Sequence, residues 1–369
     1  MKKKRLEKKK RKRVRTKDWE DKHEYAFTHD LVKHRRASVK LSETAADSNP
    51  LPKDFEPNAV VISHTKKFAF VELDGEEKLC IIDERLKEDE ATLLAPGDHV
   101  LVEFEDADAI VRGVGPRRTK LSRPSGEESR LDEQVLAANA DVLIVVAAAA
   151  RPPFREGLVD RYLIAAERGG VEPLLCVNKM DLVESEPATI GQYRELGVRV
   201  INASCETGAG IPEMREALSG KISVLAGHSG VGKSSLLNAL VPELTLQTQE
   251  VTRGERGRHT TTSARLYMLP NKIRIIDTPG IRALGLWGVT PEEVAYYFPE
   301  IGERALGCKY RNCTHIHEPQ CGVRDAFEAG DLSPARYASY LRIRASLEND
   351  RGVTPGRVSV QHSGRDLPF

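Results

Sequence analysis

A phosphate-binding motif, GHSGVGKSS at residues 227–235, constrains the fold more than any other stretch of this 369-residue sequence. It fits the pattern G-x4-G-K-[ST], follows a strand-like run (KISVLA) and opens a helix-like run (KSSLLNALV), which is the context that the pattern requires. Backbone N–H groups of such a loop surround phosphate oxygens, Lys233 reaches the β- and γ-phosphates, and Ser234 binds Mg²⁺. The residues expected to bind the phosphates are Gly227, His228, Ser229, Gly230, Val231, Gly232, Lys233, Ser234 and Ser235.

Strand-like and helix-like runs alternate from about residue 130 onward. DVLIVVA (141–147), VEPLLCVNK, VRVINAS, KISVLAG and KIRIIDTPG have the apolar character of buried strands. Between the first two, GLVDRYLIAAERGG has the period of an amphipathic helix and ends in two glycines, Gly169 and Gly170. Such alternation predicts an α/β domain with a mostly parallel sheet.

A second motif, NKMD at residues 178–181, follows one of these strand-like runs. A carboxylate there accepts hydrogen bonds from guanine N1–H and N2–H₂, which adenine does not offer, so the motif selects GTP and GDP over ATP. About 25 residues later, SCETGAGI (204–211) is similar to a short loop that supports guanine from behind. The residues expected to hold the base are Asn178, Lys179, Asp181, Ser204 and Cys205.

The motif DTPG (277–280) ends another strand-like run and completes the nucleotide site. We expect Asp277 to hold Mg²⁺ through water and the Gly280 N–H to meet the γ-phosphate. Between the phosphate loop and DTPG lies RGERGRHTTTSARL, in which a threonine hydroxyl would complete the Mg²⁺ shell. We favour Thr261 over Thr260 for this role.

The order of these motifs is unusual, because the base motif precedes the phosphate loop instead of following it. Domain termini often lie close together, so a circular permutation keeps such a site intact. The permuted order also makes DTPG the end of the nucleotide-binding domain, so that its switch leads directly into the next segment.

That next segment contains the spacing C-x4-C-x-H-x5-C within CKYRNCTHIHEPQC. Three cysteines and a histidine suit tetrahedral zinc, and a full set of four protein ligands predicts one structural Zn²⁺. The predicted ligands are Cys308, Cys313, His315 and Cys321, with His317 as the rival to His315.

The first 123 residues differ in composition and in pattern from the α/β region. Residues 1–17 hold twelve Lys and Arg against one Glu, although the whole chain has a formal net charge of only +1. A basic tail on an acidic body predicts contact with a polyanion, of which nucleic acid is the default. Short strand-like runs in residues 56–123 predict a small β-barrel, for which the OB-fold is the natural candidate, and we interpret residues 117–126 as its end and a linker.

No apolar segment follows the basic start, and the longest apolar run, VLIVVAAAA (142–150), is too short to span a bilayer. We therefore expect a cytoplasmic protein without membrane attachment. The predicted organisation is a flexible basic arm (1–55), an OB-fold RNA-binding domain (56–123), a permuted GTPase domain (124–290), and a helical zinc-binding domain with a C-terminal tail (291–369).

The barrel, the permuted motif order and the Cys₃His spacing together resemble the RsgA (YjeQ) family of small-ribosomal-subunit biogenesis GTPases over about residues 58–345. The resemblance implies a GTPase that binds the 30S subunit late in assembly, is stimulated by it, and contacts 16S rRNA through its barrel and zinc domain. We expect a monomer that acts as an assembly checkpoint factor, with GTP hydrolysis coupled to its release from the subunit. Alternatives are a passive rRNA-binding scaffold whose nucleotide site is structural, and a GTP-dependent RNA-modification factor.

The residue after DTPG is Ile281, where many GTPases carry a glutamine that orients the attacking water. Slow hydrolysis by the chain alone is therefore expected. We hypothesise that the subunit, or His259 positioned by it, orients the water.

Overall fold

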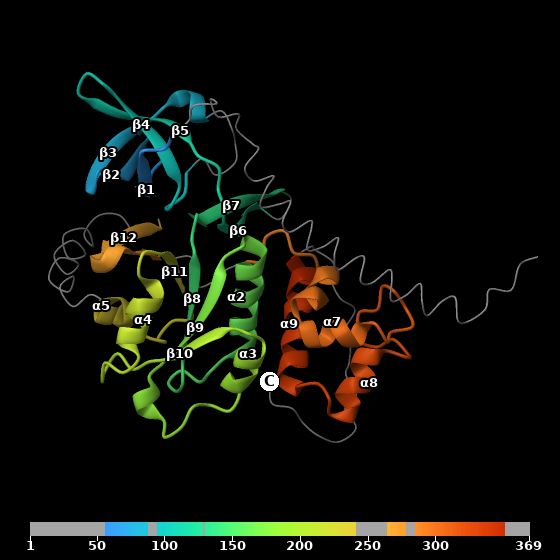
Figure 1. Ribbon diagram of the computed structural model, residues 1–369. Helices are drawn as coiled ribbons and strands as arrows, with labels where there is room; N and C mark the ends of the chain where they lie inside the picture. Colours follow the sequence, from blue (N-terminus) through green and yellow to red (C-terminus); the bar gives the residue numbers. More distant parts are fainter. Residues whose placement is uncertain (1–55, 88–93, 128–129, 241–263, 278–284, 351–369) are drawn as a thin grey trace, which may run out of the picture.

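The computed structural model describes residues 56–87, 94–127, 130–240, 264–277 and 285–350. A β-barrel lies above a central sheet with helices on both faces, and a helical C-terminal region lies beside that sheet (Figure 1). No helix in these described ranges is long and apolar enough to cross a membrane.

The predicted barrel is confirmed as a closed five-stranded barrel with the strand order β1-β2-β3-β5-β4. Each strand places small or branched apolar side chains inside, where they are buried: Val61, Val71, Cys80, Val102 and Val111. Its strands are β1 Ala59–His64, β2 Phe68–Leu73, β3 Glu76–Ile82, β4 His99–Glu105 and β5 Asp108–Val114, with the 3₁₀ turn η1 Glu84–Lys87.

A two-stranded antiparallel sheet follows the barrel, made of β6 Lys120–Glu127 and β7 Arg130–Ala138. The interpretation of residues 117–126 as a linker is thus wrong from Lys120 onward. The charged side chains and Pro124 of this segment are not typical of a strand, so its sequence does not predict one. The strand forms because its backbone pairs with that of β7. The hairpin packs on α2, where a Cβ at Gly169 would lie 2.1 Å from the Lys120 carbonyl oxygen.

The predicted α/β domain is confirmed by a six-stranded sheet of order β10-β9-β8-β11-β13-β12, in which only β12 runs antiparallel to its neighbour. Its strands are β8 Val142–Ala148, β9 Glu172–Asn178, β10 Arg199–Asn202, β11 Ile222–Ala226, β12 Arg265–Leu269 and β13 Ile273–Asp277. Its helices are α2 Glu156–Gly169, α3 Ile190–Glu195, α4 Ile211–Leu218 and α5 Lys233–Leu240, with 3₁₀ turns η2 Met180–Leu182 and η3 Pro270–Lys272.

Both faces of this sheet are covered, which explains why β8 is buried along its whole length. Tyr162 of α2 and Tyr193 of α3 belong to the apolar core on one face. Met214 of α4 and Leu236 of α5 belong to the core on the other face. The helix α2 ends where predicted, because Gly170 adopts a left-handed conformation with φ of 69°.

The C-terminal region consists of η5 Pro291–Tyr297, α7 Pro299–Ala305, α8 Gly322–Ala329 and α9 Pro334–Asp350. It shares one apolar core with α2, because Ile164 of that helix is buried among Val294, Phe298 and Tyr340. A buried ion pair joins Arg336 of α9 to Asp160 of α2. The helix α2 therefore belongs to both regions.

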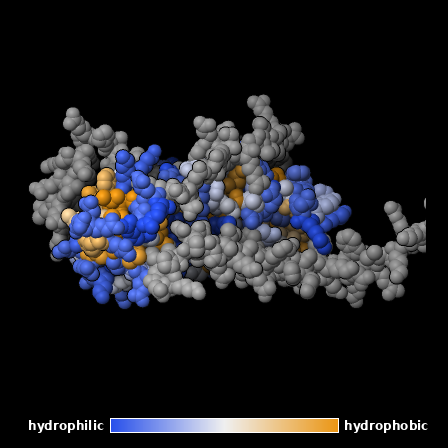
Figure 2. All heavy atoms as spheres, turned by 90° about the horizontal axis from the view of Figure 1, so that it is seen from above, coloured by the Kyte–Doolittle hydropathy of each residue, from blue (hydrophilic) through white to orange (hydrophobic). Residues whose placement is uncertain are grey.

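The barrel contacts the edge of the central sheet that is formed by β13 and β12. Arg274 of β13 pairs with Glu72 of β2 at 3.0 Å, and Arg265 of β12 pairs with Glu77 of β3 at 2.7 Å. Seen from above, the barrel shows an apolar area ringed by hydrophilic residues (Figure 2). The exposed apolar side chains of the barrel are Phe68, Leu79, Ile81 and Phe104.

Candidate nucleotide site and metal centre

The predicted nucleotide motifs meet at one edge of the central sheet, where its parallel strands end. Asn178 is the last residue of β9 and pairs with Ala148 of β8, while Asp277 is the last residue of β13 and pairs with Leu225 of β11. Ser204 follows β10, and the phosphate loop follows β11. Ligands of open α/β sheets bind at the carboxyl ends of their strands, so this edge is suited to a nucleotide.

The phosphate loop turns sharply between β11 and α5. Gly227, Gly230 and Gly232 have φ values of 144°, 81° and 97°, a backbone region that side chains rarely adopt. Helix α5 begins at Lys233, whose ammonium group donates hydrogen bonds to the carbonyls of Gly227 (2.8 Å) and His228 (2.9 Å). The Lys233 side chain thus folds back onto its own loop. A bound phosphate group would compete with these two carbonyls for its ammonium group.

Other residues of the loop that are expected to bind phosphates are accessible to a ligand. Ser234 and Ser235 are exposed in the first turn of α5, and Ser229 and Gly230 are exposed in the loop itself. His228 is half-buried, with its Nδ1 2.8 Å from the Ser229 carbonyl oxygen.

Asn178 joins the base motif to the phosphate loop. Its buried side-chain amide donates to the Val231 carbonyl at 2.9 Å, and its Oδ1 accepts from the Cys205 backbone N–H at 3.3 Å. The approach is so close that a Cβ at Gly232 would lie 2.2 Å from the Asn178 amide nitrogen. One side chain thus holds three segments that are distant in the sequence.

The carboxylate of Asp181 is oriented by Ser204, whose hydroxyl donates to it at 2.6 Å and accepts from the Thr207 N–H at 3.1 Å. Lys179, in a left-handed conformation with φ of 62°, donates to the Arg151 carbonyl. Burial raises the pKa of the neighbouring Cys205 thiol, so it stays neutral beside the base motif. Ser204 fixes the direction of the carboxylate that would read guanine.

These side chains surround a cavity of about 660 Å³, a size typical of ligand sites. Sequence reasoning missed Arg151 as one of its lining residues, because no motif includes it. The cavity is lined by Arg151, Asn178, Lys179, Asp181, Leu182, Cys205, Glu206, Gly232, Ser235, Asn238 and Ala239.

Several predicted residues lie outside the described ranges. Thr260, Thr261 and His259 fall within residues 241–263, and Gly280 and Ile281 fall within residues 278–284. Their predicted roles in Mg²⁺ binding and hydrolysis therefore stay predictions.

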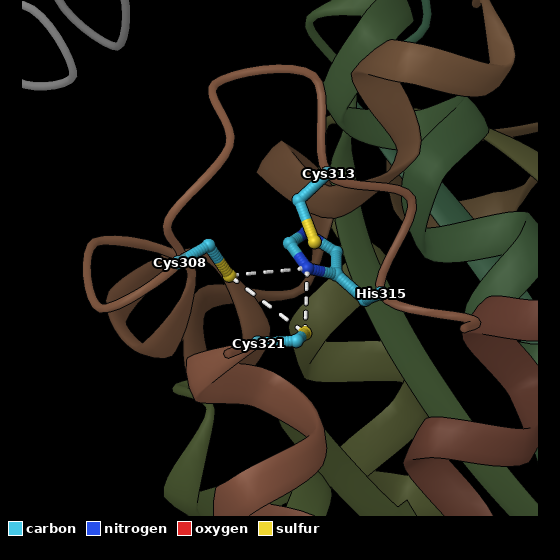
Figure 3. Close-up of side chains that lie close together, drawn as sticks. All are labelled: Cys308, Cys313, His315 and Cys321. Atoms are coloured by element: carbon cyan, nitrogen blue, oxygen red, sulfur yellow. Dashed lines mark hydrogen bonds between the residues drawn. The ribbon is translucent and has the colours of Figure 1, made fainter. Parts of the chain in front are cut away.

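The four predicted zinc ligands lie together between α7 and α8, with their ligand atoms all within 4.8 Å of one another (Figure 3). The Nδ1 atom of His315 is 3.5 Å from the sulfurs of both Cys308 and Cys321, and these two sulfurs are 3.8 Å apart. A tetrahedral zinc ion with bonds of about 2.1–2.3 Å separates its ligand atoms by roughly 3.6–3.8 Å. His315, Cys308 and Cys321 therefore have nearly the spacing of zinc ligands, and Cys313 completes the set within 4.8 Å.

The electrostatics of the cluster also suit a cation. Burial lowers the pKa of His315 to about 4, so its ring is neutral at pH 7 and offers a lone pair. Burial raises the pKa of the Cys308 and Cys313 thiols, so their ionisation needs a nearby positive charge. A divalent metal supplies that charge. His317, the rival ligand, is exposed and outside the cluster.

Hydrogen bonds fix the loop that carries the ligands. Tyr337 and Tyr340 of α9 donate to the carbonyls of His315 (2.5 Å) and Thr314 (3.0 Å). The Glu318 carboxylate accepts from the Thr314 N–H and hydroxyl at 2.8 and 2.6 Å. Burial alone would raise the pKa of Glu318, but these bonds and its contacts with nearby N–H groups lower it to about 2.

Comparison with known proteins gives a consistent result. The sequence model described as RsgA GTPase matches residues 114–287. The small ribosomal subunit biogenesis GTPase RsgA of Saccharophagus degradans is 36% identical over 340 residues, which cover 87% of this chain and 95% of the relative. The protein of the same name from Gemmatimonas aurantiaca is 42% identical over 265 residues, covering 70% and 85%.

Two solved structures share the arrangement. YjeQ from Thermotoga maritima superposes with a TM-score of 0.61 at 31% identity, covering 79% of this chain and 98% of that one. YloQ, described as a circularly permuted GTPase, superposes with a TM-score of 0.58 at 27% identity, covering 82% and 98%.

Proposed function

The chain belongs to the RsgA GTPase family, and on this premise we propose that it acts as a GTP-hydrolysing checkpoint factor in the late assembly of the small ribosomal subunit. The relatives named above carry small-subunit biogenesis in their names. The observation that carries the proposal is the gathering of the base motif and the phosphate loop around one cavity in spite of their reversed order.

Guanine selection falls to Asp181 and the loop behind it. The carboxylate accepts the guanine N1–H and N2–H₂ hydrogen bonds, while Ser204 keeps it in position. Adenine would offer the carboxylate neither of these two donors, so that of these partners only the Ser204 hydroxyl would remain. Cys205 and Lys179 also line the cavity.

The phosphates are held by the loop N–H groups and by Lys233, which exchanges its carbonyl partners for phosphate oxygens. Mg²⁺, when bound, neutralises charge on the phosphates. Ser234 and Asp277 would hold it together with Thr261, and Gly280 would donate to the γ-phosphate. Because Ile281 cannot orient water, His259 is our candidate for that role, acting in the presence of the subunit.

The γ-phosphate switch is coupled to the rest of the molecule through the residues that follow DTPG. A Cβ at Gly285 would lie 2.4 Å from Pro124 of the β6–β7 hairpin, and one at Gly288 would lie 2.9 Å from the Arg168 guanidinium of α2. The residues that follow DTPG thus pack against the hairpin and against the helix that anchors the C-terminal region, which supports our proposal that the γ-phosphate state is passed on to both. One structural Zn²⁺, held by the Cys₃His cluster, keeps that region rigid.

Contact with 16S rRNA would involve the barrel, the zinc domain and the basic arm. The closed barrel of OB-type strand order and the exposed Lys66 and Lys67 support a role for the barrel. Residues 56–116, however, hold 15 Asp and Glu against 6 Lys and Arg. We therefore assign most of the phosphate attraction to residues 1–17, so that their deletion should reduce the salt dependence of rRNA binding.

The remaining parts of the proposal concern organisation and location. We propose a monomer that works in the cytoplasm, where ribosomal subunits are assembled. Its regions are the arm (1–55), the barrel domain (56–123), the permuted GTPase domain (124–290) and the zinc domain with its tail (291–369).

Turnover of GTP by the full chain, measured with and without purified small subunits and with ATP as a control, tests the proposal. We expect slow GTP hydrolysis alone, strong stimulation by subunits, and no ATP hydrolysis. If GTP is not hydrolysed even with subunits, the chain is a passive scaffold. Single-turnover assays of His259→Ala would separate a role for this residue from a role for the subunit, because an unchanged stimulated rate rules the histidine out.

A further inference from the structure

Arg151 reaches the nucleotide cavity from a loop that carries none of the nucleotide motifs. It lies between β8 and α2 and lines the cavity together with Asn178, Gly232 and Ser235. Those neighbours belong to the base motif, the phosphate loop and the first turn of α5. Arg151 is thus placed where the two halves of the site meet.

The backbone of Arg151 is held firmly at this position. Its φ of 51° is left-handed, and its carbonyl accepts the hydrogen bond from Lys179 of the base motif. The next residue, Pro152, lies beside the phosphate loop, where a Cβ at Gly230 would be in ordinary van der Waals contact with its ring at 3.8 Å. The Arg151 side chain therefore extends from a backbone that is held in place beside both motifs.

The charges around Arg151 leave its guanidinium available. No hydrogen bond or ion pair of this guanidinium with an acidic side chain is found in the described part of the chain. Two exposed carboxylates share the cavity: Asp181, which is oriented by Ser204, and Glu206. A planar guanidinium binds phosphate oxygens through paired hydrogen bonds, which a point charge such as a lysine ammonium does not provide.

We propose that Arg151 is a phosphate-binding residue of this site, and that its guanidinium supplements Lys233 on the phosphate chain of the guanine nucleotide. The inference rests on the guanine-nucleotide site proposed above. It predicts that affinity depends on Arg151 only for ligands that carry phosphate.

Calorimetric titration of the full chain with GDP and GMP, with guanosine binding measured by saturation-transfer NMR, tests this assignment. For Arg151→Gln we expect GDP to bind about tenfold to a hundredfold more weakly, as for loss of one charge-assisted hydrogen bond, with guanosine unchanged. Arg151→Lys should recover part of the loss, because it restores the charge without the fork.

Arg199→Gln is the matched control, since Arg199 is a half-exposed arginine at the amino end of β10, away from the strand ends that form the site. Its GDP affinity should equal that of the wild type. Equal weakening of guanosine and GDP in Arg151→Gln would overturn the assignment, because Arg151 would then hold the base or ribose. Unchanged GDP affinity would overturn it as well. Failure of the wild type to bind GDP would instead refute the nucleotide site itself.

Discussion

The ion pair between α2 and α9 offers a quantitative test of how the GTPase and zinc regions are joined. Arg336 of α9 is 4% exposed and pairs with Asp160 of α2, which is 1% exposed, and with Glu300 of α7 at 2.5 Å. Its guanidinium also lies 4.3 Å from the centre of the Phe298 ring. Arg336→Met keeps much of the apolar volume and removes only the charge and its donors.

The expected loss in the free energy of unfolding is about 3–5 kcal/mol, the range for breaking a buried ion pair from one side. The reason is that Asp160 keeps only weaker partners, such as the Tyr193 hydroxyl at 3.1 Å. Neutralising the orphaned carboxylate in Arg336→Met/Asp160→Asn should recover about 2 kcal/mol of this loss, within the usual range of coupling energies.

The loss should also depend on pH in a defined direction. Burial raises the pKa of Asp160 above its ordinary value of 3.8, while Arg336 opposes that rise. Without Arg336 the folded-state pKa rises further, so the folded variant takes up a proton more readily than its unfolded chain. The penalty is therefore complete above the folded-state pKa and shrinks as the pH falls through it towards 3.8.

Urea unfolding of wild type, both single variants and the double variant, in buffer with excess zinc at pH 7.5 and pH 5.5, measures these differences. A loss below 1 kcal/mol for Arg336→Met would refute the reasoning. So would a double variant whose loss equals the sum of the two single losses, or a penalty that grows on acidification.

Three further predictions concern the two sites. His315→Ala should abolish zinc binding in metal analysis and lower the melting temperature by roughly 10 °C, whereas replacement of the exposed His317 by Ala should change neither. Equal effects of the two variants would contradict the ligand assignment. Gly232→Ala should weaken GDP binding at least about tenfold in calorimetry, because its Cβ would collide with the Asn178 amide. An affinity equal to that of the wild type would show that the Asn178 side chain can move aside without weakening GDP binding. Asp181→Asn should lower GTP affinity by at least about tenfold and favour xanthosine triphosphate, in which a carbonyl oxygen on C2 replaces the amino group of guanine and accepts a hydrogen bond; a variant that still prefers GTP would show that another group reads the base.

The sequence was most informative where chemistry restricts the residue type. A phosphate loop needs glycines with positive φ, and Gly227, Gly230 and Gly232 all have it. The permuted order was also readable, because each motif follows an apolar strand-like run. For the metal centre, spacing left both His315 and His317 as ligands, and only burial in the folded chain separates them.

Features that depend on partners distant in the sequence were not predictable. Arg151 belongs to no motif, and its place in the cavity follows from the turn between β8 and α2. The interpretation of residues 117–126 as the end of the barrel and a linker misses strand β6, because its residues are charged and the strand is stabilised by pairing with β7 and by packing on α2. The buried charge of Arg336 is visible only when α2 and α9 are brought together.

The strand order of the central sheet has a consequence for how each new molecule is made. Strands β8, β9 and β10 form one contiguous half of the sheet, and β11, β13 and β12 form the other. Synthesis proceeds from the N-terminus, so the half of the sheet that carries the base motif emerges from the ribosome before the phosphate loop does. Its strands can pair early, but the sheet is complete only when β13, which ends at Asp277, has emerged. A nucleotide that binds only the folded site would therefore stabilise the completed domain and not its first half, which would make its binding a late step in the folding of the domain.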